Sequence, residues 1–294
     1  MSNTIAGVNL AQIAQESLPA LQVLFAPLSG ISTDFSSDIA DRGASVTTRY
    51  PVNVTAQDLS AGFDSTNVET VASTITLNQY PGFVYGFSDL ERSKSSINLN
   101  DLFIQPAMQA VGTSMFGSLW NLVTAANFDA TPLTSTAANF DRNDLADLRA
   151  QLNVQGAPQQ GRAVVLSPAY FASLLKSLNT AEFPGFIREK GEGFIPRVAG
   201  FDVYESTLAD ANGEYLQGFA FHKSALLMAA RSVNADGAVQ TGTEIADVVI
   251  PQLNLPIQFR RAYDNRLGQL WYSFGVLFGI QKGRPQMGVR IVSQ

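Results

Sequence analysis

Few residues in this chain are arranged for chemistry. The single histidine, His222, ends a short aromatic strand, so a Ser-His-Asp triad or a histidine-ligated metal site would depend on it alone. Packing at the strand end is the favoured interpretation. The nearest approach to a nucleophile elbow is Gly112-Thr-Ser114-Met-Phe116, which lacks the second glycine and lies inside a predicted helix. The sequence therefore predicts no nucleophilic site.

Motifs for metals and nucleotides are equally weak. Residues 234–237, Asn-Ala-Asp-Gly, resemble part of a calcium loop, but serine occupies the first position and Glu244 falls one residue beyond the twelfth. A plain turn is favoured. There is no P-loop, no GxGxxG and no cysteine. Asp144 and Asp147 fall on a solvated helix face, where the helix dipole explains them. We expect no catalytic, cofactor-binding or metal-binding residues and no enzyme activity.

The composition indicates that much uncharged surface of the folded chain is buried. The 294 residues are 46% hydrophobic and only 15% charged, and subunit contacts are one place to bury such a surface. The net charge of −6 argues against a general nucleic-acid binder. Six basic residues and one acidic residue follow position 256, a local net charge of +5 that leaves −11 for the remainder. Residues 1–14 have no signal-peptide pattern, and the absence of cysteine suits the cytosol.

A long uncharged helix is predicted over residues 101–128. Seven apolar residues recur at helical steps of 4, 3, 4, 4, 3 and 4, while polar residues occupy the other side, so we reject a membrane span. At about 1.5 Å per residue the helix would be roughly 40 Å long. Pro106 fits its first turn. The apolar stripe consists of Ile104, Met108, Val111, Met115, Leu119, Leu122 and Ala126.

A long β-hairpin precedes this helix. Residues 44–56 alternate with strict period 2, and residues 71–77 are equally rich in β-branched side chains. The polar connection 57–70 would form a broad acidic tip. Pro51 places the first strand at an edge. Because a two-stranded ribbon is marginal alone in water, a neighbouring chain is a plausible support.

The remaining segments predict an α/β unit followed by closing strands. Residues 1–40 read as an arm that is either disordered or ordered on another subunit, and Ser88 with Glu91 has capping-box spacing. Residues 130–138 form a spacer, after which Asn143 would cap a helix. We expect strands at 162–166, 198–205, 218–221, 255–263 and 269–280, and helices after Pro168 and at 223–230.

In this order, the elements resemble the major capsid proteins of tailed bacteriophages with the HK97 fold. Each motif is weak alone, but the resemblance covers nearly the whole chain. The segments that carry it are Asp38-Ile-Ala-Asp41, residues 71–77, Ser88-Asp89, Phe103-Ile-Gln-Pro-Ala107, Arg162-Ala-Val-Val-Leu-Ser-Pro168, Gly200-Phe-Asp-Val-Tyr204 and Phe221-His-Lys-Ser-Ala225.

The resemblance implies an α+β fold with four parts. These are an N-terminal arm (1–40), an extended hairpin or E-loop (41–87), a P-domain with a spine helix and sheet (88–128 and 256–294) and an α/β A-domain (129–255). It also implies a chain that assembles with itself into hexamers and pentamers of an icosahedral shell in the host cytoplasm. That shell would enclose double-stranded DNA without sequence-specific binding, alongside a portal and a separate scaffolding protein, because the arm is too short for a fused scaffold. No membrane or cofactor is implied.

Charge complementarity supplies the candidate assembly contacts. The acidic residues at the hairpin tip would meet basic residues near the P-domain strands of a neighbour, each exposed pair contributing about 0–1 kcal/mol. A relative of this fold joins subunits by isopeptide bonds that start from an E-loop lysine, but residues 44–86 contain Arg49 and no lysine, so we expect no such cross-link. The candidate contacts are Arg49, Asp58, Asp64, Glu69, Arg260, Arg261 and Arg266.

Two alternatives remain open. An encapsulin-like compartment shell would share the fold but hold protein cargo instead of DNA. A soluble α/β enzyme with an unrecognised site would form monomers or small oligomers, whereas a shell protein would form megadalton particles.

Overall fold

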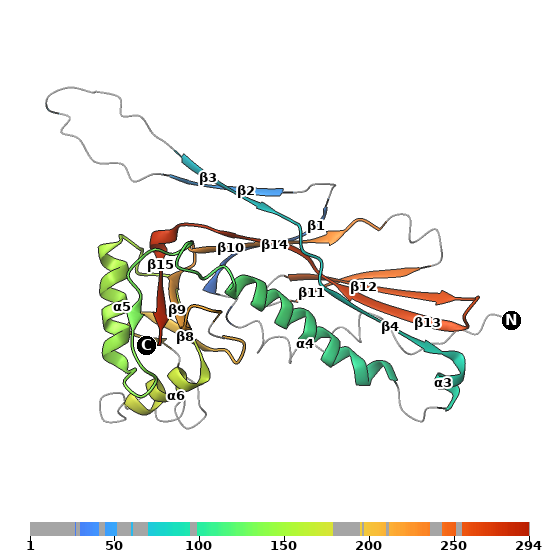
Figure 1. Ribbon diagram of the computed structural model, residues 1–294. Coiled ribbons are helices and arrows are strands. Elements are labelled where there is room, and N and C mark those ends of the chain that lie inside the picture. Colours follow the sequence, from blue (N-terminus) through green and yellow to red (C-terminus); the bar gives the residue numbers. More distant parts are fainter. Residues whose placement is uncertain are drawn as a thin grey trace.

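Helix α4 (Leu99–Trp120) runs along the middle of the molecule, between a sheet-rich end and a mixed end (Figure 1). The computed structural model describes residues 27, 30–40, 45–51, 60, 70–94, 99–178, 195, 197–209, 212–235, 243–250 and 255–293. The predicted stripe faces the core: Met108, Val111, Met115 and Leu119 are buried. No helix in the described ranges is long and apolar enough to cross a membrane.

The bounds of α4 differ from the predicted 101–128. The helix begins at Leu99, so Pro106 lies inside it instead of in its first turn. It ends at Trp120 because the chain turns back into the core, where Val123 and Phe128 are fully buried. Tertiary packing therefore overrides the helical periodicity of the last eight residues.

A four-stranded antiparallel sheet forms one end of the molecule. Its order is β11 (Glu244–Ile250), β12 (Leu255–Asp264), β13 (Gln269–Gly275) and β4 (Gly82–Ser88). One face packs on the core beside α4 through a cluster of aromatic rings (Figure 1). Those rings belong to Tyr85, Phe259, Tyr272 and Phe274. The strand predicted at 255–263 is confirmed.

The strand predicted at 269–280 is divided between two sheets. After β13, the chain bends at Val276 and continues as β14 (Leu277–Lys282), which pairs with β10 (Leu226–Val233). The predicted helix at 223–230 is wrong, because most of that segment lies in β10. On the other side of β10, strand β1 (Ser32–Ala40) runs parallel to it. Residues 32–40 are therefore part of a sheet and not of a free arm.

A six-stranded sheet with two helices forms the other end. The strand order is β5 (Leu133–Thr134), β15 (Gly288–Val292), β9 (Leu216–His222), β6 (Arg162–Leu166), β8 (Phe201–Glu205) and β7 (Arg197–Val198). Helices α5 (Arg142–Val154) and α6 (Pro168–Ser177) lie at the same end (Figure 1). Because β15 pairs with β9, residues 288–292 lie in this unit and not with the predicted P-domain.

Local signals account for most helix starts. Ser88 and Glu91 form the predicted capping box at the start of α3 (Asp89–Lys94), with Ser88 N donating to Glu91 Oε2 over 2.9 Å. Helix α5 has a capping box as well, but its N-cap is Asp141 and not the predicted Asn143. The backbone nitrogens of residues 143 and 144 donate to Asp141 Oδ1.

Candidate interaction surfaces

The predicted hairpin is present as a two-stranded sheet that projects from the body. Strand β2 (Ser45–Pro51) pairs antiparallel with β3 (Thr70–Thr76), and in Figure 1 both lead away from the other sheets. The register places alternate residues on a common face, and the described side chains of one face are all exposed. These are Ser45, Thr47, Arg49, Ala72, Thr74 and Thr76.

The root of the hairpin is fixed firmly to the three-stranded sheet. Ile75 is 3% exposed and packs with Leu227 and Ala229 in a small cluster separate from the main core. The backbones of Gln79 and Phe278 exchange two hydrogen bonds of 3.0 and 2.9 Å. The root is therefore held by the subunit itself, while the opposite face of the hairpin stays available to other molecules.

Of the three predicted arginines on β12 and in the turn after it, two have side-chain partners within the chain. Arg260 donates from Nε and Nη2 to the amide oxygen of Gln258, over 3.0 and 2.7 Å. Arg261 forms an ion pair of 3.4 Å with Glu244 on β11. Arg266 lies exposed in the turn between β12 and β13. The structure thus brings these three arginines to one β-hairpin.

The predicted acidic partners, Asp58, Asp64 and Glu69, lie outside the described residues. Arg49 is exposed on β2, far along the molecule from β12 and β13 (Figure 1). The pairing of acidic tip and basic strands, which the sequence predicts between subunits, therefore stays a prediction.

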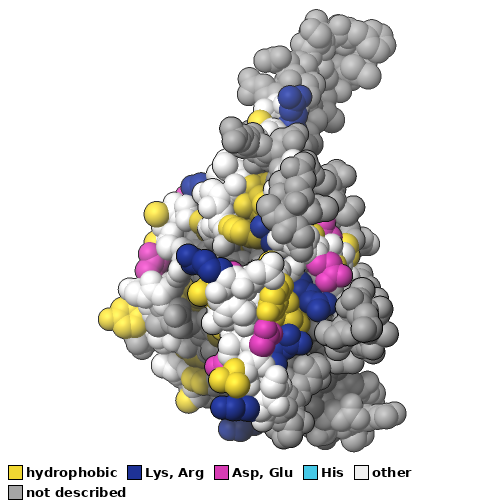
Figure 2. All heavy atoms as spheres, turned by 90° about the vertical axis from the view of Figure 1, so that its right-hand side faces the viewer, with side chains coloured by type: hydrophobic (Ala, Val, Ile, Leu, Met, Phe, Trp, Pro, Cys, Tyr) yellow, Lys and Arg dark blue, Asp and Glu magenta, His cyan; other side chains and the backbone are white. Residues whose placement is uncertain are grey.

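Helix α3 and the turn after β12 form a surface with both charged and hydrophobic side chains at the end of the four-stranded sheet. The turn after β12 holds α3, because Asp89 N donates to Gly268 O over 2.9 Å and Tyr263 donates its hydroxyl proton to the Asp89 carboxylate. This hydrogen bond to Asp89 raises the pKa of Tyr263. Leu90 and Leu267 are 63% and 51% exposed. Figure 2, which faces this end, shows hydrophobic side chains among Lys, Arg, Asp and Glu at the surface.

The sheet face turned away from the core carries an apolar strip that the sequence analysis missed. Val84 on β4 is 61% exposed, and Tyr80, just before this strand, is 50% exposed. Trp271 lies so close over Gly86 that a Cβ there would meet its ring. The alternation of residues along β4 and β13 could have indicated this face, but only once the two strands were known to pair.

A partly buried charge network connects the chain just after α4 to the six-stranded sheet. Arg290 on β15 is 8% exposed, and its Nη1 lies 2.9 Å from Glu214 Oε2. The same oxygen accepts a hydrogen bond from Ala125 N over 2.7 Å, and Arg290 Nε donates to Phe128 O over 3.3 Å. These interactions fix the chain just after the C-terminal end of α4.

His222 has a packing role. It is 7% exposed, and its Nδ1 lies 2.8 Å from Ser224 Oγ. Burial lowers its pKa, and the nearby charges of Lys223, Arg162 and Arg284 lower it further. Among the described residues, no group of three or more His, Asp or Glu is placed to hold a metal ion.

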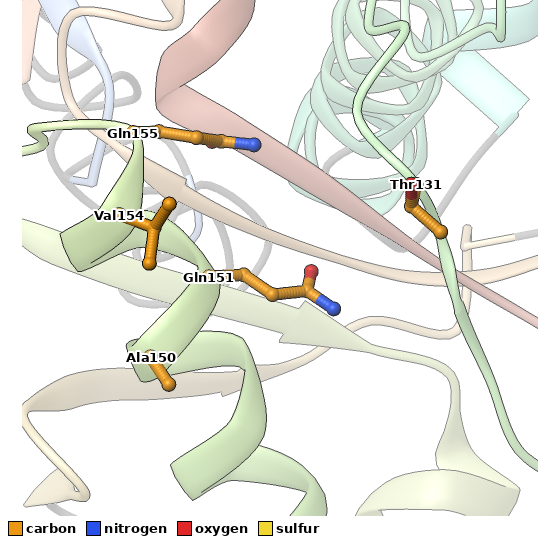
Figure 3. A pocket seen from close by; sticks show the side chains of 5 residues that line it. All are labelled: Thr131, Ala150, Gln151, Val154 and Gln155. Atoms are coloured by element: carbon orange, nitrogen blue, oxygen red, sulfur yellow. The ribbon is translucent and has the colours of Figure 1, made fainter.

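An open hollow of about 350 Å³ lies at the end of α5. Gln151 and Gln155 extend from the helix toward Thr131 across it, and Val154 and Ala150 complete the lining (Figure 3). None of these five side chains titrates, so they offer no group for proton transfer.

Comparisons with known proteins agree with the fold described above. A family model described as "Phage capsid protein" matches residues 70–291. No curated protein matches the chain. A structure from Mycobacterium phage Che8 has a TM-score of 0.58 at 17% identity, covering 99% of this chain and 95% of that one. The bacteriophage PhiM1 mature capsid gives 0.57 at 14% identity, covering 90% and 86%. The capsid of Myoviridae phage XM1 gives 0.54 at 11% identity, covering 92% of each. The predicted α+β capsid fold is confirmed.

Proposed function

The chain belongs to the phage capsid protein family, and we propose that it assembles with itself into the hexamers and pentamers of an icosahedral shell. As a member of that family it is a structural protein of the virion capsid and not an enzyme. The finer steps of assembly, and the partners in it, are the subject of the proposal.

The observation that carries the proposal is the projecting hairpin of β2 and β3. A two-stranded ribbon is marginally stable alone in water, yet this one leaves the body with one face exposed along its described length. Its root is clamped by its own subunit through Ile75 and Gln79. A rigid root with a free outer face is suited to reach across a neighbouring copy, as the E-loop of the HK97 fold does.

The division into domains follows the sheets. In this proposal α4 and the four-stranded sheet form the P-domain, and the six-stranded sheet with α5 and α6 forms the A-domain. Strand β15 then belongs to the A-domain, because it pairs with β9. Residues 41–81 correspond to the E-loop, because β4 belongs to the four-stranded sheet, and residues 1–31 to the arm that precedes β1.

Further partners are part of the proposal. Double-stranded DNA would be enclosed without sequence-specific contacts, and a portal and a separate scaffolding protein would take part in assembly. The net charge of −6 is consistent with enclosing DNA without binding it tightly.

The test is the size and content of the particles that the purified protein forms. We expect megadalton particles on a sizing column and closed shells in an electron micrograph. Monomers or small oligomers at all concentrations would contradict the proposal. Nuclease-protected DNA inside particles from infected cells is expected, whereas protein cargo in its place would indicate a compartment shell with the same fold.

A further inference from the structure

Arg260 is held in a fixed position on the same face of the four-stranded sheet as Val84. Its Nε and Nη2 both donate to Gln258 Oε1, two residues earlier on the same face of β12. Gln258 is 4% exposed, so its amide is a rigid support. Gln258 Nε2 in turn donates to Val233 O over 2.9 Å and to Asp247 Oδ1 over 3.2 Å.

With Gln258 as its support, the Arg260 guanidinium keeps N–H donors that can bind a further acceptor. The guanidinium has five N–H donors, and the hydrogen bonds to Gln258 come from Nε and Nη2. The side chain is partly exposed. Because its rotamer is already fixed, little conformational entropy is lost when an acceptor binds. Arg260 is therefore organised in advance for a carboxylate.

The surroundings of Arg260 suit a protein contact. Cross-strand register places Ser273 beside Arg260 and Val84 beyond it, roughly 10 Å from Arg260 on the same face. Val84 and Tyr80 are 61% and 50% exposed. An arginine that shares a surface with exposed aromatic and aliphatic side chains has the composition typical of interface hot spots.

The neighbouring arginines are less suited to this role. Arg261 points to the opposite face of β12, where it already pairs with Glu244 at 3.4 Å. Arg266 lies in an exposed turn, where its backbone nitrogen donates to Asp264 Oδ1 over 2.8 Å. An exposed, solvated cation loses more entropy on binding than one that is already held.

We propose that Arg260 is the residue that receives a carboxylate from a second copy of this chain, and that Gln258 positions it for that contact. The inference rests on the proposed self-assembly and specifies its contact. Charge complementarity identifies the segment that supplies the carboxylate. Residues 57–70 contain Asp58, Asp64 and Glu69 and no lysine or arginine. We expect the contact to bury Val84 and Tyr80.

Charge reversal tests the contact. We expect Arg260→Glu to raise the critical concentration for assembly at least about tenfold, since a hydrogen-bonded charge pair is lost and a repulsion gained. Arg266→Glu is the matched control, because it makes the same charge change on the same β-hairpin, and we expect it to assemble as the unmodified chain does. Circular dichroism and thermal unfolding of the unassembled subunits check that each variant folds.

Rescue identifies the partner. In chains that carry Arg260→Glu, one of Asp58→Lys, Asp64→Lys or Glu69→Lys is expected to restore assembly. Gln258→Met tests the positioning role: it should weaken assembly in the unmodified chain and have no further effect in the Arg260→Glu chain. Additive effects would mean that Gln258 acts only through stability and would overturn its positioning role.

The two levels of the proposal fail in different ways. If the unmodified chain forms no particles, self-assembly itself is wrong. If it forms particles and a folded Arg260→Glu chain assembles at the same concentration, or no lysine variant rescues a defective one, the Arg260 contact is wrong. Loss of assembly in Arg266→Glu but not in Arg260→Glu would show that Arg266 in the turn makes the contact, and would overturn the role of Arg260.

Discussion

At the scale of single residues, His222 should make the fold sensitive to mild acid. Its folded-state pKa lies below 6.5 because of burial and nearby cations. The unfolded chain therefore binds the proton first as the pH falls, and the free energy of unfolding decreases from about pH 6.5 down to the folded pKa. We expect thermal unfolding of the subunit to shift to lower temperature between pH 7 and pH 5.

This effect can be assigned to one residue, because the chain contains a single histidine. His222→Asn keeps a hydrogen-bonding atom near Ser224 but does not titrate in this range, so its unfolding temperature should change less between pH 7 and pH 5. Carboxylates titrate mostly below this window. An equally steep dependence in the variant would exclude His222 as the cause.

A second prediction at this scale concerns covalent cross-links. An isopeptide bond needs an amine nucleophile, and residues 44–86 contain no lysine. Assembled shells boiled in SDS should therefore run as a monomer band near 31.6 kDa. A ladder of covalent oligomers would show that another amine takes this role.

Residue types alone could suggest candidate side chains, but not the partners of those side chains. The sequence singled out Arg260, yet its support by Gln258 and Asp247 depends on the pairing of β11 with β12, which sequence reasoning did not foresee. The N-cap of α5 shows the same limit. Asn143 and Asp141 are both good capping residues, and only the fold decides that Asp141 takes that place.

At the scale of elements, the hairpin root should be a separate weak point. Ile75 belongs to a small cluster apart from the main core, so Ile75→Ala should loosen the hairpin without unfolding the rest. A loss of about 2–4 kcal/mol in local stability is expected. Hydrogen exchange should become faster in β3 but not in β6 or β9. Thr74→Ala, on the exposed face of the same strand, is the control and should change little.

The hairpin tip should matter for assembly and not for folding. A chain without residues 57–70 should unfold at nearly the same temperature, because Thr70, at the end of β3, is the only one of them that belongs to the paired strands β2 and β3. Its subunits should fail to form closed shells in electron micrographs. Closed shells of normal size would show that the tip is dispensable.

Local pattern accounts for the elements that are predicted correctly and for those that are not. Strand β2 and the capping box at Ser88 follow from period-2 alternation and spacing. Strand β10 was predicted as a helix because Leu226-Leu-Met-Ala-Ala230 favours a helix by propensity. Pairing with β1 and β14 overrides that preference. The division of residues 269–280 between two sheets depends on where a partner strand lies, which periodicity does not record.

At the scale of the whole molecule, distant parts of the chain hold the two ends together. Strand β15 pairs with β9 in the six-stranded sheet, and β10 joins β1 to β14. Such non-local pairings leave no local signature, so the sequence did not indicate that β1 pairs with β10 or that β15 pairs with β9. One continuous core links α4 with both of the larger sheets.

The network of Glu214 and Arg290 should set how firmly α4 is joined to the six-stranded sheet. Arg290→Met keeps much of the side-chain volume but removes the donors to Glu214 and to Phe128 O. Breaking a largely buried pair in this way should lower the free energy of unfolding by about 2–4 kcal/mol. The exposed pair Arg197–Asp202 offers a matched control, because Arg197→Met should cost about 0–1 kcal/mol. Denaturant unfolding of unassembled subunits measures both.

If the network also fixes the angle between the two ends, shells of the Arg290→Met chain should vary in diameter while those of Arg197→Met stay uniform. Equal unfolding free energies in the two variants would show that the network adds nothing beyond a surface pair.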